Sequence, residues 1–543
     1  MGQASVLARR GAPRTGELSD ESCGIFSELT AFAGAETLVR FIVGEDHKPQ
    51  KLSANEIDGE LGDPFATLLL AKGTFPRTAA GVFEAVDATV GENEPLGKNS
   101  QMSFILGEGS QIPFNEAPNL RRSLRFVVTR GRSPDGPELI VSAFQPDQAD
   151  DVELMAWDAK SDGFNFYRSL GEEGSWVFAG KSRDALVEPS QRKGPFESHK
   201  SGTFLMKELR APWINWHSPD ANIFPTVFSD ADPRREHPWF TGKVGQGALV
   251  CETSVARPAI TRWTKARFTH AVAGGGTVAD PGRIMEQILD TPTVNLMTSH
   301  TEGKAAANAT SVDLPERFFV DAEGLSEILG LQPPPAFAVS GQIYQSALET
   351  FDVKLSDGQG FERVGETHFA FVIPERAFED EEVLRHAIEI GLVSRRLAAA
   401  LLMTDFPNPV FSVRRAKLLE QVPKAATVAN KQSTFSEEMA QAILAAADGS
   451  PEGSPEREFA ERWAIGEQFE DSFNALLQGY YQAVEAGLQD QERFNEYFRL
   501  AESRRQRVKQ MPIFENPLLF ATTNVSDAER TMRVDGRVEG GGT

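Results

Sequence analysis

Residues 152–180, VELMAWDAKSDGFNFYRSLGEEGSWVFAG, decide the expected fold of this chain. Three short runs rich in Val, Phe and Trp are separated by the turn sequences DAKSDG and GEEG. Upstream, SLRFVVTR and ELIVSAF repeat the pattern, with GRSPDGP and QPDQADD as breaks. Strands at this spacing, joined by Gly and Asp turns, predict an antiparallel β-meander. Val152, Leu154 and Ala156 then share one aliphatic face, and the intervening residues place charge and large rings on the other, which we expect to be the wetter one.

Helical patterns surround this strand region. Residues 24–90 are mostly helical in character, and DPGRIMEQILD predicts a helix with Pro281 at its first position. One long helix is expected over 379–403, with acidic residues in its first turn, where they suit the helix dipole. Residues 430–512 are expected to form a helical block that ends in an antiparallel helix pair. Residues 246–272, in contrast, have a sequence pattern that predicts strands.

The predicted fold class is therefore α+β, with an antiparallel β-meander or sandwich-like core, flanking helices and a C-terminal helical hairpin block. The expected organisation has six segments: a flexible leader (1–22), a helical region (23–115), a β-rich region with an aromatic loop (116–280), a mixed α/β region (281–425), a helical region (426–515) and a disordered tail (516–543).

Composition narrows the class of protein. The chain has 543 residues, two cysteines and a formal net charge of −23. Such a charge repels polyanions, so we expect no nucleic-acid partner and no membrane partner. Two distant cysteines and the lack of a secretory signal at the start of the sequence favour a reducing, cytoplasmic location. A homo-oligomer is compatible with these features.

Histidines, carboxylates and tryptophans gather in the stretch FESHKSGTFLMKELRAPWINWHSPD, residues 196–220. Glu197 and His199 are two residues apart, so on an extended segment they point to the same side. Two histidines and a carboxylate can hold a redox metal with open coordination positions. The expected ligands of an iron, manganese or zinc ion are His199, His217, Glu197 and Glu208.

Two further residues complete this hypothesis. His237 is a candidate acid–base group or third imidazole, and Arg210 is a candidate for holding a substrate carboxylate, because its planar fork suits bidentate contact. The first functional interpretation is thus a metal-dependent oxidoreductase that acts on a small organic or modified-peptide substrate. Purely structural roles for the same histidines stay open, since histidines at strand ends often bond main-chain carbonyls.

The second interpretation is a non-catalytic ligand-binding or assembly protein. The loop 213–239 carries Trp213, Trp216 and Trp239, which are candidates for a binding surface. The common sequence signatures of hydrolases and nucleotide-binding enzymes, such as Gly-x-Ser-x-Gly and His-Glu-x-x-His, do not occur. The sequence therefore leaves an enzyme and a binding protein as the two alternatives.

Overall fold

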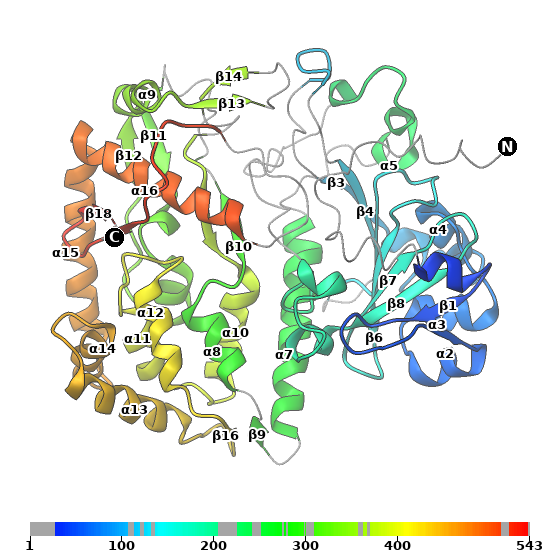
Figure 1. The fold of residues 1–543 in the computed structure, drawn as a ribbon, viewed down its shortest axis with the longest axis horizontal. Helices are drawn as coiled ribbons and strands as arrows, with labels where there is room; N and C mark the ends of the chain where they lie inside the picture. The colour runs from blue at the N-terminus through cyan, green and yellow to red at the C-terminus, as the bar shows by residue number, and fades with distance from the viewer. Residues whose placement is uncertain are drawn as a thin grey trace.

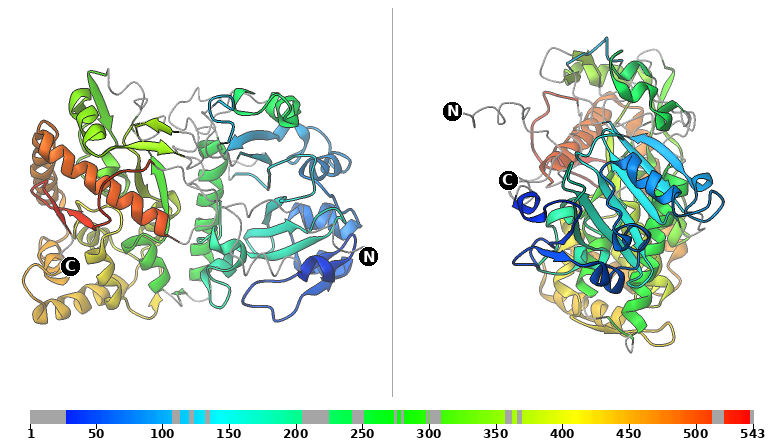
Figure 2. Two further views of the ribbon diagram at one scale, coloured as in Figure 1. Left: turned by 45° about the horizontal axis from the view of Figure 1, so that its top comes forward. Right: turned by 90° about the vertical axis from the view of Figure 1, so that its right-hand side faces the viewer.

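The computed structural model describes residues 28–106, 113–119, 124–131, 136–204, 225–241, 251–273, 276–278, 281–297, 299, 309–356, 362–365, 370–511 and 521–540. An eight-stranded sheet with its helices forms one side of the molecule and a mainly helical part forms the other. Helix α7 (Arg257–Ala273) lies between them (Figure 1, Figure 2). The fold is thus a mixed α+β arrangement with a C-terminal helical block.

The large sheet has the strand order β2-β1-β8-β7-β6-β5-β4-β3. Strands β3 to β8 follow one another in the chain, and each is antiparallel to the next. Strand β1 pairs parallel with β8 and antiparallel with β2. The bounds are β1 (Leu38–Arg40), β2 (Gln50–Leu52), β3 (Met102–Leu106), β4 (Arg125–Arg130), β5 (Leu139–Ala143), β6 (Glu153–Asp158), β7 (Gly163–Ser169) and β8 (Trp176–Lys181).

Both faces of this sheet are buried. Val152, Leu154 and Ala156 share a core with helices α2 (Ala54–Glu60), α3 (Pro64–Leu68) and α4 (Ala79–Asp87). The opposite face, with Met155 and Trp157, packs on α7 and on the π-helical turn before it, η9 (Glu252–Ala256). The expectation of one wet face is therefore wrong, because the large rings on that face are covered by a helix.

That covering helix replaces the strands expected over 246–272. In the described part of this range, the apolar residues Val255, Ala256, Ala259, Ile260 and Trp263 are spaced three or four apart and share one core cluster. This spacing matches one face of a helix and not the alternation of a strand. The local β-like composition misled the prediction, because tertiary packing overrides weak intrinsic propensity.

The second half of the molecule has its own core of mainly helical residues. Among the described residues outside the large sheet are five small antiparallel pairs. Two of them are β10 (Val294–Met297) with β15 (Ile373–Arg376) and β11 (Ser311–Leu314) with β12 (Phe337–Ser340). The helices of this half are α8 (Pro281–Leu289), α9 (Gly341–Thr350), α10 (Phe378–Glu389), α11 (Arg395–Leu402), α12 (Val413–Lys417), α13 (Phe435–Gly449), α14 (Pro455–Ala464), α15 (Glu470–Leu488) and α16 (Gln491–Gln510). Further described strands are β9 (Thr277–Val278), β13 (Lys354–Ser356), β14 (Glu362–Val364), β16 (Ala426–Thr427), β17 (Arg530–Met532) and β18 (Val538–Gly540), and the short helix α5 (Pro238–Thr241) lies beside the large sheet.

The helix predicted from Pro281 is confirmed as α8, whereas the long helix over 379–403 is two helices. Gly391 separates α10 from α11 with φ 77°, and a Cβ there would lie 1.9 Å from the Lys431 main-chain oxygen. Ser394 then caps α11, accepting a hydrogen bond from the Leu397 amide at 3.1 Å. A glycine in the left-handed region followed by a serine cap ends one helix and starts the next. Within the described residues, no helix is long and apolar enough to cross a bilayer.

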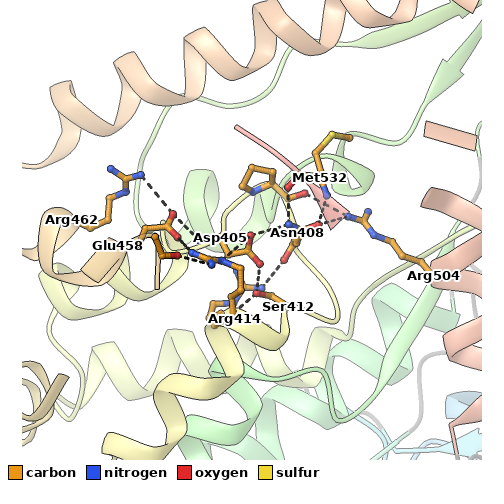
Figure 3. A network of polar contacts seen from close by, with 11 residues as sticks. Asp405, Asn408, Ser412, Arg414, Glu458, Arg462, Arg504 and Met532 are labelled. Carbon is orange, nitrogen blue, oxygen red and sulfur yellow. Dashed lines mark hydrogen bonds and ion pairs between the residues drawn. The ribbon is translucent and has the colours of Figure 1, made fainter. Parts of the chain in front are cut away.

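The C-terminal segment also differs from the expected disordered tail. Within 521–540, β17 and β18 form an antiparallel hairpin. Asn408 holds this hairpin with two hydrogen bonds to Met532, one to its main-chain oxygen and one from its main-chain nitrogen, both at 2.9 Å (Figure 3). Asp405 in turn accepts from the Asn408 amide at 2.9 Å and from the Ser412 hydroxyl at 2.5 Å. The buried Asn408 amide is hydrogen-bonded to Met532 and to Asp405, so the hairpin is packed as part of the fold.

We expect Asn408→Ala to lower the free energy of unfolding by about 2 to 4 kcal/mol, because it leaves both main-chain groups of Met532 buried without a partner. Gln478→Ala, on the exposed face of α15, is the control and should change it by less than about 0.5 kcal/mol. Urea unfolding measures the difference. Hydrogen exchange of residues 530–540 should also rise in Asn408→Ala, and unchanged exchange there would contradict the anchoring role.

Candidate functional site

The segment that carries His199 lies on the sheet face that packs against α7. Residues 194–204, here called the junction loop, begin with the short helix η5 (Gly194–Glu197). The His199 ring lies 5.3 Å from the Phe166 ring, and its Nδ1 lies 2.8 Å from the Thr203 main-chain oxygen. Glu197 is half-buried at the end of η5. The His199 ring is thus oriented by core packing and by a main-chain carbonyl.

His237 and Trp239 lie on the opposite face of the sheet. The His237 ring is 5.6 Å from Phe126 and 5.0 Å from Trp239, and Trp239 also contacts Phe83 at 5.6 Å. The Trp239 amide donates to His237 Nδ1 at 3.2 Å, and His237 Nε2 lies 3.6 Å from an Asp147 carboxylate oxygen. Burial lowers the pKa of His237, with Asp147 acting in the opposite direction. Both rings serve as packing at the start of α5.

The predicted metal and substrate residues are therefore only partly assembled. Phe166 and Phe126 belong to the cores on opposite faces of one sheet, so the sheet separates His199 from His237. Among the described residues, no group of three or more His, Cys, Asp or Glu side chains is placed to hold a metal ion. The other predicted residues, His217, Glu208, Arg210, Trp213 and Trp216, lie outside the described residues.

The junction loop connects the two halves of the molecule. The Trp263 indole of α7 donates to the Ser201 main-chain oxygen at 2.8 Å, and Lys200 Nζ donates to the Pro292 main-chain oxygen at 3.0 Å. Gln287 of α8 donates through Nε2 to the Ser201 hydroxyl at 3.2 Å. Through Gln287 the loop reaches a second group of residues, which sequence reasoning did not identify as a site.

That group is the first turn of α10, which buries four consecutive acids. Glu379, Asp380, Glu381 and Glu382 are exposed by 4%, 0%, 2% and 4%. Helix α10 starts directly after β15 and packs against α7, α8 and the π-helical turn η12 (Glu323–Ile328). Acids of its first turn contact Thr261 of α7 and Gln287 of α8. Carboxylates in such a position need partners, since an isolated buried charge is strongly unfavourable.

Two of the four acids have cationic partners. Glu381 accepts from Arg317 Nη1 at 2.5 Å, and Glu382 accepts from Arg385 Nε at 3.1 Å. The second Glu382 oxygen accepts from the Thr261 hydroxyl at 2.9 Å. Both acids are thus held in ion pairs. Burial nevertheless raises the pKa of Glu381 to about 8, against the effect of Arg317.

Glu379 and Asp380, here called the carboxyl pair, differ from them. Asp380 Oδ1 accepts from Gln287 Nε2 at 2.8 Å, but Asp380 Oδ2 and Glu379 Oε2 are buried and have no hydrogen-bond partner among the described residues. Burial, and then the neighbouring Asp380, raises the pKa of Glu379 to about 8. Burial raises the pKa of Asp380 to about 7, against the effects of Arg376 and Gln287. We therefore expect at least one of the two to hold a proton near neutral pH.

The sequence did contain a signal for this site. Consecutive residues of a helix are about 100° apart, so four acids in a row surround the whole helix. The four acids are flanked by Phe378 and Val383, which are apolar, and the helix could not place all four acids in water if it packed on more than one side. Their position in the first turn of a helix also suits the helix dipole, but this alone does not predict their burial.

Comparison with protein-family models, with curated proteins and with solved structures finds no match for this chain. The functional argument therefore rests on the geometry of the junction loop and the carboxyl pair.

The carboxyl pair should make stability depend on pH. In the folded protein both pKa values lie above those of unfolded Asp and Glu, so the folded state binds more protons. Their contribution is fully present below about pH 4 and is lost as the pH rises through about 7 to 8. The free energy of unfolding should therefore fall between pH 5 and pH 9.

Glu379→Gln should be about as stable as the wild type at pH 5 and about 2 to 4 kcal/mol more stable at pH 9, because the amide keeps the shape and never ionises. Glu389→Gln, at an exposed position of the same helix, should leave the pH profile unchanged. Urea unfolding across this pH range provides the measurement. A Glu379→Gln profile parallel to the wild type would contradict the raised pKa of Glu379.

Proposed function

We propose that the protein is an enzyme that acts on a small organic substrate by proton transfer, with Glu379 and Asp380 as its acid–base pair. The observation that carries this proposal is the pair itself: two adjoining buried carboxyl groups, each with one oxygen that lacks a partner, joined to the junction loop through Gln287.

The chemistry of the pair suits this role. A general acid or base works best when its pKa lies near the working pH, and neighbouring carboxyl groups can divide the two roles. Asp380 receives a hydrogen bond that favours its ionised form, so it is the base, and Glu379 is the acid. On each group, one oxygen that has no hydrogen-bond partner among the described residues could accept a hydrogen bond from a substrate atom or donate one to it.

The neighbouring acids argue against a purely structural pair. Glu381 and Glu382 lie in the same helical turn at similar burial and are paired with Arg317 and Arg385. The fold thus gives Glu381 and Glu382 direct ion pairs in this turn. Asp380 instead accepts from the Gln287 amide, and Arg376 and Arg283 influence it through their charge. Unpaired buried carboxyl groups lower stability, and such groups gather at functional sites.

The two interpretations made from the sequence remain predictions. Metal-dependent oxidoreductase chemistry would require His199 and Glu197 together with residues outside the described part of the chain. The ligand-binding alternative depends in the same way on Trp213 and Trp216. The carboxyl pair needs neither of these sets.

Carbodiimide coupling tests whether small molecules reach the pair. We expect a water-soluble carbodiimide with glycinamide at pH 7 to convert Glu379 or Asp380 into the amide in the native protein, because a protonated carboxyl group reacts first. Glu382 is the matched control, since it is as buried as Glu379 and ion-paired with Arg385. Peptide mass spectrometry locates the products. Labelling of the pair only in urea-unfolded protein would rule out a substrate site there.

A further inference from the structure

Gln287 touches both the carboxyl pair and the junction loop. Its side chain, in a residue exposed by 2%, donates through Nε2 to Asp380 Oδ1 at 2.8 Å and to the Ser201 hydroxyl at 3.2 Å. Its Oε1 accepts from Arg267 Nη1 of α7 at 2.6 Å. One amide therefore joins α7, α8, α10 and the loop.

The orientation of this amide is determined by chemistry. Arginine only donates hydrogen bonds, so the atom that faces Arg267 must be the amide oxygen. The amide nitrogen then faces Asp380 and Ser201, and its two hydrogens suffice for one bond to each. If the amide were reversed, its nitrogen would face a guanidinium and its oxygen would face a carboxylate, which is unfavourable on both sides.

We infer that Gln287 is a positioning residue that couples the proton of the carboxyl pair to the seating of the junction loop. By seating we mean the hydrogen-bonded position of the loop against α7 and α8. The inference deepens the proposed function and rests on it for the acid and base roles, but its measurement needs no turnover. An ionised Asp380 accepts a stronger, charge-assisted bond from Gln287 than a protonated one. That bond holds the amide so that its second hydrogen points at Ser201, and the loop is seated.

Protonation of Asp380 weakens the first bond and frees the amide to turn away from Ser201. The proton that leaves Asp380 goes to water or to Glu379, so the loop would seat when Asp380 is the base. This is the state in which an enclosed pair could act on a bound molecule. Loss of the Gln287 bond should loosen the loop without disturbing the helices.

Other charged groups of the described residues face Asp380 from each element packed against it. Arg376 comes from β15, Arg283 and Glu286 from α8, and Glu379 from α10 itself. Arg267 of α7 donates to the Oε1 of Gln287, whose Nε2 in turn donates to Asp380. The two arginines that face Asp380 directly are held elsewhere: Arg283 pairs with Glu286, and Arg376 pairs with Asp321 at 2.8 Å. Gln287 is thus the described donor that can respond to the charge on Asp380.

Hydrogen exchange of the junction loop between pH 5.5 and pH 8.5, corrected for intrinsic rates, tests the coupling. The Gly202 amide is a suitable reporter, because it donates to the His199 main-chain oxygen at 2.8 Å within the loop. In the wild type we expect protection of the loop to rise about tenfold across this range. Gln287→Met, which keeps the size and removes both donors, should abolish this dependence and leave exchange about tenfold faster at pH 8.5.

Ser201→Ala separates the coupling from a merely structural role. Both variants should speed exchange of the loop, but only Gln287→Met removes the donor to Asp380. The pH at which stability falls should therefore move upward in Gln287→Met and stay at its wild-type value in Ser201→Ala. Equal profiles for the two variants, or loop exchange that does not depend on pH in the wild type, would overturn the inference.

Asp380→Asn keeps the test decisive if Gln287→Met does not fold. It preserves the shape of the side chain and removes its charge, so the loop should exchange at the fast, low-pH rate throughout the range. A slow, pH-dependent loop in this variant would also overturn the inference. The carbodiimide experiment is a separate test. If the pair is not labelled but the loop responds to the charge on Asp380, the proposed enzymatic function is wrong and the coupling stands. If the pair is labelled but the loop does not respond, only the coupling is wrong.

Discussion

The hydrogen bonds of Arg376 determine where the carboxyl-rich turn can lie. This guanidinium is exposed by only 6% and donates to the main-chain oxygens of Gln287 and Ile288, at the C-terminal end of α8, and to Asp321 at 2.8 Å. The last carbonyls of a helix lack partners within the helix and carry partial negative charge, so a buried cation satisfies them well. Asp321 uses its other oxygen to accept from the Gly324 amide at the start of η12, at 2.9 Å.

One cation therefore fixes β15, α8 and η12 against each other, and α10 begins two residues after it in the chain. The first turn of α10 has to enter the space between these elements. Its four acids are buried as a consequence of connectivity and not because they prefer the interior. Arg317 and Arg385 bind Glu381 and Glu382, and both also contact Glu323. The ion pairs of Arg317, Arg376 and Arg385 therefore include those with Asp321, Glu323, Glu381 and Glu382. Glu379 and Asp380 are the acids of the turn that form none of these ion pairs.

Local chemistry made much of the sheet predictable from the sequence. Strands β4 to β8 each coincide with an expected run, because short alternating segments bounded by Gly and Asp turns have few other stable solutions. Helix α8 was predictable from Pro281 for the same reason. Residues 251–273 were not, since the choice between strand and helix there depends on how Trp263 and Ile260 meet the sheet. The break at Gly391 depends on contact with Lys431, which is far away in the chain.

The candidate site was harder to predict because histidines and aromatic residues that are close together in the sequence need not be close together in space. Residues 196–204 lie on one face of the sheet and residues 237–240 on the other, so a ring-rich segment supplied packing to two cores and brought His199 and His237 to opposite sides. The carboxyl pair, in contrast, is 180 residues from the junction loop and meets it through Gln287. What distinguishes the pair is which groups bind each acid in the folded protein. Glu381 and Glu382 form ion pairs with guanidinium groups, whereas Asp380 accepts a hydrogen bond from the amide of Gln287. A single amide can satisfy a carboxylate only in part, and for this reason its response to the proton on Asp380 can be transmitted to the loop.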